Sequence, residues 1–201
     1  MSEPIDFYFD FSSPYGYLAS EKIDAIAEKF GRKVRWHPIL LGVVFKGTGA
    51  VPLTLAAPVK SDYYRLDFSR SARFMGIPYT HPANFPIATQ HAARTYYWLH
   101  AQDCSKARAF AHAAYRGFFV EGRDISDLAV VLDLASALGA DKGVLSEALA
   151  SPALKERLKS ECEDAISKGV FGSPFILVDG EPFFGADRLP QFERWLESGG
   201  F

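Results

Sequence analysis

The chain opens with a strand–helix–strand pattern. Residues 5–11, IDFYFDF, alternate along the chain and are mostly aromatic, as in a β-strand. Apolar positions then recur at an approximately helical spacing, so we predict one helix that begins after Ser13 and ends at Gly31. Residues 33–41, KVRWHPILL, predict a second strand. A unit of this size implies parallel strands and a right-handed crossover.

Helical periodicity fills the middle of the chain. Residues 45–60 are rich in Gly, Pro and Ala and predict a loop. From Lys60 onward, apolar positions at helical spacing are separated by short breakers such as EGRD and GADKG. The helices predicted from this pattern cover residues 60–76, 87–102, 106–121, 126–138, 142–150 and 152–168.

Strand character returns near the end of the chain. Residues 173–185, SPFILVDGEPFFG, predict two short strands that turn at Asp179-Gly180, a strong hairpin signal. A last helix is predicted over residues 186–199. The order β-α-β, then helices, then β-β-α is that of a thioredoxin-like fold. We therefore predict an α/β protein, namely a thioredoxin-like β-α-β…β-β-α domain with a large all-helical insertion.

This order divides the chain into a domain and an insertion. We expect residues 1–46 and 169–201 to form the thioredoxin-like domain, and residues 47–168 to form the inserted helical domain. The chain has 201 residues, of which 48% are hydrophobic, and this is enough for one core with an insertion.

Charge and composition argue against several classes of function. A net charge of −2 gives no reason to expect binding to nucleic acid or to an anionic membrane. No apolar run approaches the ~20 residues of a membrane span, and Met1–Pro4 does not resemble a secretory signal, so we expect a cytoplasmic protein. Cys104 and Cys162 form no C-x-x-C motif and are expected to be free. The histidines lack metal-ligand spacing, so we expect no metal site.

The junction of the first strand and helix carries two serines and a proline. Thioredoxin-like redox proteins place a C-x-x-C motif here, where the helix N-terminus lowers the pKa of the first cysteine. Ser12, Ser13 and Pro14 supply no sulfur, which excludes disulfide exchange at this position. A hydroxyl and free N–H groups remain, and they can stabilise a thiolate that belongs to a ligand. Ser13 can also be simply the N-cap of the helix.

Ser173-Pro174 supplies a second indication. A proline at the start of a late strand in this fold is usually cis, so we predict a cis bond here. Such a bond exposes the N–H and C=O groups of the preceding residue to a peptide-like ligand. A serine that faces a thiol beside such a backbone site suggests glutathione. An ordinary edge-strand proline is the alternative.

Four segments together resemble one family. They are DFYFDFSSPYGYL, KSDYYRLDFSRSARFMGIP, FGSPFILVDGE and FFGADRL, and they span the whole chain in order. This pattern is similar to that of 2-hydroxychromene-2-carboxylate isomerases and of kappa-class glutathione transferases. The resemblance implies a thioredoxin-like, DsbA-type fold with a helical insertion, a homodimer, and glutathione as cofactor.

The resemblance also implies roles for particular residues. Ser13 matches the active serine, which would hydrogen-bond the glutathione sulfur. Asp187 matches the acid for the γ-glutamyl amino group, although it can also be only a helix cap. The full implied glutathione site is Ser13, Lys60, Tyr63, Gly172, Ser173, Pro174, Asp187 and Arg188, and the implied substrate side is Lys46, Asn84 and Phe85.

Two positions depart from the family pattern. The family often has Asn where this chain has Ala50 and Ala186, so two amide side chains are missing from the implied ligand contacts of these loops. Lys46 can also be a solvated loop lysine.

The implied activity is a glutathione-dependent isomerisation of 2-hydroxychromene-2-carboxylate-type aromatic acids. In it a thiolate adds reversibly, the ring opens, a bond rotates, and elimination returns the thiol. A kappa-like transferase that conjugates electrophiles is one alternative, and a non-catalytic protein that binds glutathione or another thiol peptide is another. The absence of sulfur at Ser12 and Ser13 opposes a disulfide oxidoreductase.

Overall fold

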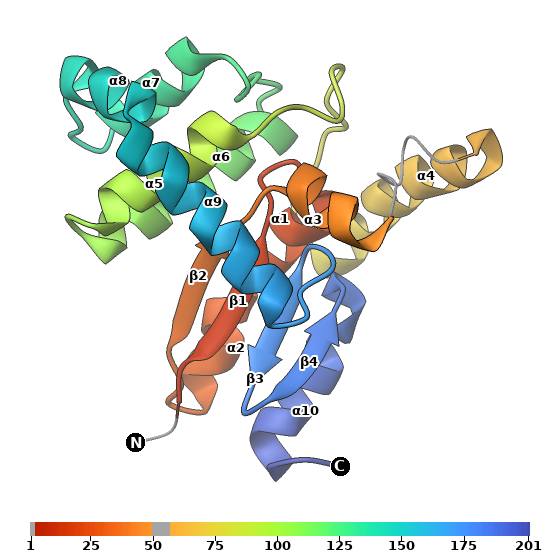
Figure 1. The fold of residues 1–201 in the computed structure, drawn as a ribbon. Helices are drawn as coiled ribbons and strands as arrows, with labels where there is room; N and C mark the ends of the chain where they lie inside the picture. Colours follow the sequence, from red (N-terminus) through yellow and green to blue (C-terminus); the bar gives the residue numbers. More distant parts are fainter. Residues whose placement is uncertain (1–2, 50–56) are drawn as a thin grey trace.

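A four-stranded mixed sheet joins the two ends of the chain (Figure 1). The structure is a computed structural model and describes residues 3–49 and 57–201. The strand order is β2-β1-β3-β4; β1 runs parallel to β2, and β3 is antiparallel to both β1 and β4. This arrangement confirms the predicted order of strands and the thioredoxin-like fold. The strands are β1 Ile5–Phe9, β2 Val34–Pro38, β3 Phe175–Val178 and β4 Glu181–Phe184.

Helices account for most of the remaining described chain. Those from α4 to α9 begin and end within four residues of their predicted bounds. In the described ranges no helix is long and apolar enough to cross a membrane. The helices are α1 Pro14–Ser20, α2 Ile23–Lys29, α3 Leu41–Thr48, α4 Pro58–Met75, α5 Gln90–His100, α6 Cys104–Phe119, α7 Leu128–Ser136, α8 Lys142–Ala150, α9 Pro152–Ser167 and α10 Leu189–Ser198, with a 3-10 turn, η2, at Ala186–Arg188.

The predicted single helix over 13–31 is wrong, because α1 and α2 are separate. The Ser20 hydroxyl donates to the Tyr17 carbonyl at 2.7 Å, a bond that competes with regular helix geometry. The Glu21 carboxylate accepts from Arg116 on α6 at 2.6 Å, which ties the turn between the two helices to the helical region. Tertiary contacts therefore override a weak helical stripe.

Two further predictions are wrong here. The strand does not continue to residue 41, and the segment from residue 45 does not begin as a loop. β2 ends at Pro38, and α3 occupies Leu41–Thr48. Leu40 stands at the N-cap of α3 and cannot cap it with its own side chain. The Asp10 carboxylate does so instead, since the Leu41 N–H donates to Asp10 Oδ2 at 2.6 Å. A cap supplied from 31 residues away along the chain leaves no local signal.

The strand ends that matter for the site meet at one edge of the sheet. Because β1 and β2 are parallel, the residues that follow them emerge at the same edge. Because β3 is antiparallel to β1, the residues that precede β3 arrive there too. Ser13, Leu41 and Ser173 are therefore brought together although they are far apart in sequence.

The central strand β1 is buried on both faces. On one face Phe7 and Phe9 pack edge-on against Trp36, with ring centroids 5.1 and 5.4 Å apart. On the other, Tyr8 stacks on His37 at 4.7 Å, below helix α9, while α2 and α10 cover the opposite side (Figure 1). The division into a domain and an insertion stays a prediction, and α3 spans its first boundary at residues 46 and 47.

Both cysteines are free, as predicted. Cys104 is exposed at the start of α6, and Cys162 is buried on α9, where its sulfur accepts a hydrogen bond from the Leu40 N–H at 3.3 Å. Among the residues that the structure describes, no group of three or more His, Cys, Asp or Glu side chains could hold a metal ion.

A charged cluster joins α9 to the sheet. His37 Nε2 lies 2.8 Å from Asp6 Oδ1, and His37 Nδ1 lies 3.8 Å from Glu161 Oε2 on α9. The Arg35 guanidinium forms a bidentate pair with the Asp6 carboxylate, with N···O distances of 2.7 and 2.9 Å. Burial raises the pKa of Asp6, but the hydrogen bonds and charges of His37 and Arg35 outweigh it and lower that pKa to about 2. Burial lowers the pKa of His37, yet Asp6 and Glu161 raise it overall.

The sign of these shifts predicts a pH dependence of stability. The pKa of His37 is higher in the folded state than in the unfolded state. Its contribution to stability is therefore complete below the unfolded-state pKa and is lost as the pH rises through the folded-state pKa. We expect His37→Gln to lower the free energy of unfolding by about 2 kcal/mol near pH 5.5, the scale of charged hydrogen bonds, and by clearly less near pH 9. Denaturant unfolding at both pH values measures this.

The control for this prediction is His100→Gln. Burial lowers the pKa of His100, so any pH dependence there should have the opposite sign. An equal loss at both pH values in His37→Gln would show that the imidazolium charge does not contribute.

Candidate active site

A large cavity lies along the edge of the sheet where these strand ends meet. Its volume is about 1550 Å³. Its floor is formed by the start of α1 and the segment before β3, and its sides by α3, α4, the 85–90 segment and η2. The polar and charged residues on its wall include Asp10, Ser12, Ser13, Lys46, Asp67, Ser173, Asp187 and Arg188.

Ser13 caps α1 and is held by two hydrogen bonds. Its Oγ accepts from the Gly16 N–H at 3.0 Å and donates to the Ser173 carbonyl at 2.9 Å. The side chain is thus both an N-cap and part of the cavity wall, so the two interpretations of the sequence are compatible. To donate to a ligand, the hydroxyl must give up its bond to Ser173.

The Ser173-Pro174 bond is cis, as predicted. Ser173 is buried, and its Oγ accepts from the Asp10 N–H at 3.0 Å, so its side chain fixes the end of β1. Its carbonyl faces Ser13. Two segments from opposite ends of the chain therefore share one hydrogen-bond junction at the floor of the cavity.

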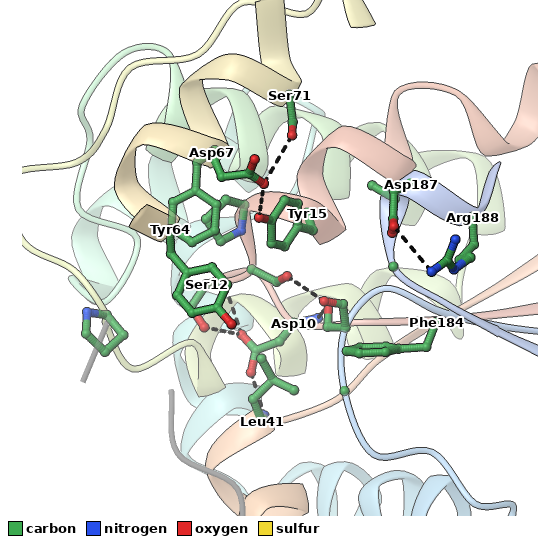
Figure 2. A pocket seen from close by; sticks show the side chains of 18 of the residues that line it. Asp10, Ser12, Tyr15, Leu41, Tyr64, Asp67, Ser71, Phe184, Asp187 and Arg188 are labelled. Atoms are coloured by element: carbon green, nitrogen blue, oxygen red, sulfur yellow. Dashed lines mark hydrogen bonds and ion pairs between the residues drawn. The ribbon is translucent and has the colours of Figure 1, made fainter. Parts of the chain in front are cut away.

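Asp10 belongs to the candidate site, although the sequence pattern did not single it out. Its carboxylate is 3% exposed and borders the cavity. Oδ1 accepts from the Ser12 N–H at 2.8 Å, the Ser12 hydroxyl at 2.9 Å and the Thr89 hydroxyl at 2.8 Å (Figure 2). Burial raises the pKa of Asp10, against the opposing effect of its hydrogen bonds. The available signal was an acidic residue at the end of a buried strand, directly before a Ser-Ser pair.

Aromatic side chains cover the side of the cavity formed by α1 and α4. Tyr64 projects toward Ser12 in Figure 2, and Tyr15 packs edge-on against Phe68 with ring centroids 5.0 Å apart. The Tyr15 hydroxyl donates to Asp67 on α4, which fastens α1 to α4. Burial and the Asp67 carboxylate both raise the pKa of Tyr15, so the phenol stays protonated. The rings on this wall are Tyr15, Tyr63, Tyr64, Phe68 and Phe74, and Phe85 of the 85–90 segment adds another.

Opposite charges occupy the other side of the cavity. Arg188 Nη2 lies 3.7 Å from Asp187 Oδ2, and both side chains are largely exposed on η2 (Figure 2). Phe184 lies beside them and covers Gly172, where an added Cβ would come within 2.4 Å of the ring. The lack of a side chain at Gly172 permits this close approach. The cavity wall thus carries an anionic and a cationic side chain in addition to the hydroxyls of Ser12 and Ser13.

The structure brings most of the predicted site residues to this cavity. Lys60, Asn84 and Pro174 are not among the described residues that line it; Lys60 is exposed, and the Asn84 amide lies 3.4 Å from Asp124. Ala186 lines the wall and is buried, whereas Ala50 lies outside the described residues. The predicted residues on the wall are Ser13, Lys46, Tyr63, Phe85, Gly172, Ser173, Asp187 and Arg188.

Known proteins share both the sequence pattern and the fold. Residues 4–197 match the family model described as a DSBA-like thioredoxin domain. A 2-hydroxychromene-2-carboxylate isomerase of Sphingobium xenophagum is 32% identical over 98% of this chain and 99% of its own. A glutathione S-transferase kappa 2 of Caenorhabditis elegans is 27% identical over 96% of this chain and 91% of its own.

The solved structure of a 2-hydroxychromene-2-carboxylate isomerase superposes with a TM-score of 0.87 at 29% identity, covering 97% of this chain and 95% of that one. These matches confirm the resemblance that the four sequence segments indicated. By its fold, its cavity at the end of β1 and these relatives, the chain belongs to the family of DSBA-like thioredoxin domains.

Proposed function

We propose that this protein is a glutathione-dependent isomerase of 2-hydroxychromene-2-carboxylate-type aromatic acids. The observation that carries the proposal is the cavity, in which a cysteine-free α1 terminus faces a wall of aromatic rings. Relatives named as this isomerase, at about one third identity over nearly the whole chain, support it. The aromatic wall suits a flat ring system, and a nearby lysine suits a carboxylate.

Charged and polar groups on the cavity wall support glutathione as the proposed cofactor. The proposed site places the thiol at Ser13, the cysteinyl backbone at Ser173 and the γ-glutamyl ammonium at Asp187. Arg188, beside Asp187, suits a carboxylate of the same peptide. Gly172, Pro174, Lys60 and Tyr63 complete the proposed glutathione site, although Lys60 and Pro174 lie outside the described wall.

The proposed substrate lies between the floor and α3. Lys46, exposed on the last turn of α3, would bind the substrate carboxylate, and Phe85 would pack against its ring. Asn84 is proposed to hold the Phe85 segment through its hydrogen bond to Asp124.

In the proposed reaction, bound glutathione supplies a thiolate that adds reversibly to the substrate and is eliminated after a bond rotation. Free thiols titrate at about 8.5, so the protein must favour the thiolate at neutral pH. The Ser13 hydroxyl would turn from the Ser173 carbonyl to the sulfur and stabilise its charge. The aromatic wall would hold the substrate and exclude water.

A kappa-like transferase is the second candidate, favoured by the kappa relatives of Caenorhabditis elegans. It would use the same residues but release a glutathione conjugate. A non-catalytic protein that binds glutathione is the third. The homodimer and the cytoplasmic location implied by the family stay predictions; the exposed apolar side chains Val59, Leu66 and Phe74 make α4 the surface on which we would place a partner copy.

A glutathione balance distinguishes these functions. Purified protein is incubated with glutathione and 2-hydroxychromene-2-carboxylate, and free thiol and substrate absorbance are followed together. We expect the absorbance to change while the thiol concentration stays constant, because the isomerase regenerates its thiol. Thiol loss in step with substrate would identify a transferase. Glutathione binding by calorimetry with no change in substrate would refute the proposed substrate.

A further inference from the structure

The Asp10 carboxylate is buried at the cavity wall. Its oxygens accept from two backbone amides, of Ser12 and Leu41, and from two hydroxyls, of Ser12 and Thr89. No ion pair in residues 3–49 and 57–201 involves it. A buried, unpaired carboxylate is costly, and at a cavity wall it is a candidate for chemistry.

The two kinds of donor behave differently if Asp10 takes up a proton. A backbone N–H can only donate, so the Ser12 and Leu41 amides hold the carboxylate in place in either state. A hydroxyl can donate or accept, so its hydrogen bond can reverse. Both hydroxyls belong to residues that line the cavity, but Thr89 is 3% exposed, whereas Ser12 is only partly buried. Ser12 is thus the better placed of the two to face a ligand.

We propose that Asp10 accepts the thiol proton of glutathione bound in this cavity, and that the Ser12 hydroxyl carries the proton between them. This inference rests on the proposed glutathione dependence. Ser13 would still donate to the sulfur, while Asp10, acting through Ser12, would receive the proton that the sulfur loses.

The transfer balances within the site. The S–H bond breaks and its proton bonds to Ser12 Oγ, while the Ser12 O–H bond breaks and its proton bonds to Asp10 Oδ1. The electron pair of the S–H bond stays on sulfur, so the negative charge moves from the carboxylate to the thiolate. Asp10 then donates to Ser12 Oγ, and Ser12 donates to the sulfur. Elimination at the end of the cycle reverses these steps.

The surroundings of Asp10 favour this exchange. The Tyr115 hydroxyl donates to the Asp10 carbonyl at 3.0 Å. The Cys162 sulfur accepts from the N–H of Leu40, the residue before the Leu41 that caps onto Asp10. Burial raises the pKa of both groups, with a further contribution from the Asp10 charge, so both are neutral at pH 7. Burial likewise raises the pKa of Asp10 itself, which brings it toward that of a stabilised thiol.

Asp10 also has a structural role as the cap of α3, and the experiment must separate the two roles. Calorimetry at about pH 7 in buffers of different ionisation enthalpy gives the protons released per glutathione bound, and ultraviolet absorbance gives the thiolate formed. S-methylglutathione, which has no thiol proton, supplies the baseline. We expect the protein to form thiolate with about zero additional protons released.

The variant Ser12→Ala removes the carrier but leaves three donors to Asp10. We expect its thiolate to form only at higher pH, with about one proton released for each. Thr89→Val is the matched control, because it also removes one hydroxyl from Oδ1, and its proton count should remain near zero. Asp10→Asn is unsuitable, since its amide nitrogen would face the N–H of Ser12 or Leu41.

Release of about one proton per thiolate in the unaltered protein would overturn this inference but not the proposed function. An equal proton count in Ser12→Ala and the unaltered protein would do the same. Absence of binding heat with either peptide would overturn the proposed function and this inference together.

Discussion

Ser13→Ala is expected to lower turnover at least about tenfold while the protein stays folded, on the scale of losing one positioned donor. The hydroxyl is the group on the cavity floor that can turn from the Ser173 carbonyl to a sulfur. Its removal also leaves the Gly16 N–H without its cap, which costs about 1 kcal/mol of stability. Steady-state kinetics with glutathione and thermal unfolding measure the two effects separately.

Ser20→Ala is the matched control for this substitution. Ser20 is buried in the same helix and also donates to a backbone carbonyl, but it is not among the described residues that line the cavity. We expect a similar small loss of stability with little change in turnover. A folded Ser13→Ala protein with unchanged kinetics would contradict the role of Ser13 as the thiolate stabiliser.

Gly16→Ala is expected to have the larger effect on stability. An added Cβ would lie 2.7 Å from Ser173 Oγ, 2.7 Å from Tyr115 Oη and 3.1 Å from Ser13 Cβ. Ser173 Oγ and Tyr115 Oη both hydrogen-bond the Asp10 backbone, so neither can move without breaking its bond. We expect the free energy of unfolding to fall by about 2–4 kcal/mol and Tm to fall by roughly 5–15 °C. Glutathione binding should also weaken.

Gly117→Ala tests whether this effect is specific to the junction. Gly117 is also a buried helical glycine, but its nearest neighbour, Leu134 Cδ1, would be at an ordinary 3.6 Å from the new Cβ. There we expect a neutral or slightly stabilising change, because alanine favours the helix. Equal losses at the two positions would mean that the Gly16 contacts relax freely.

Local signals predicted most of the fold. The strand order, the hairpin at Asp179-Gly180 and the helices from α4 to α9 follow from periodicity and turn residues, which act over short distances along the chain. The errors lie where a distant residue decides the local structure. The split between α1 and α2 involves Arg116, and the cap of α3 comes from Asp10, so neither could be predicted from neighbouring residues.

The candidate site was predictable in its outline but not in its connections. Ser13 and Ser173 stand out in the sequence, because each precedes a proline at the start of an element. The hydrogen bond between their hydroxyl and carbonyl, however, is a property of the assembled sheet edge. The hydrogen bond from Tyr15 to Asp67 is likewise a tertiary contact. The sequence alone suggests only a pair between Asp67 and Arg70 on the same helix, which the structure also contains.

The junction between Ser13 and Ser173 has a consequence for how the protein is made. The two residues are 160 positions apart, so the floor of the cavity cannot close until the final hairpin has been synthesised. Closing so long a loop costs conformational entropy and places the junction among contacts that slow folding. When α1 to α9 have emerged from the ribosome, the side of β1 that pairs with β3 in the folded sheet is still open. Until then the chain carries an open sheet edge, and the capacity to bind a ligand at this floor arises only once Ser173 and the β3–β4 hairpin have been synthesised.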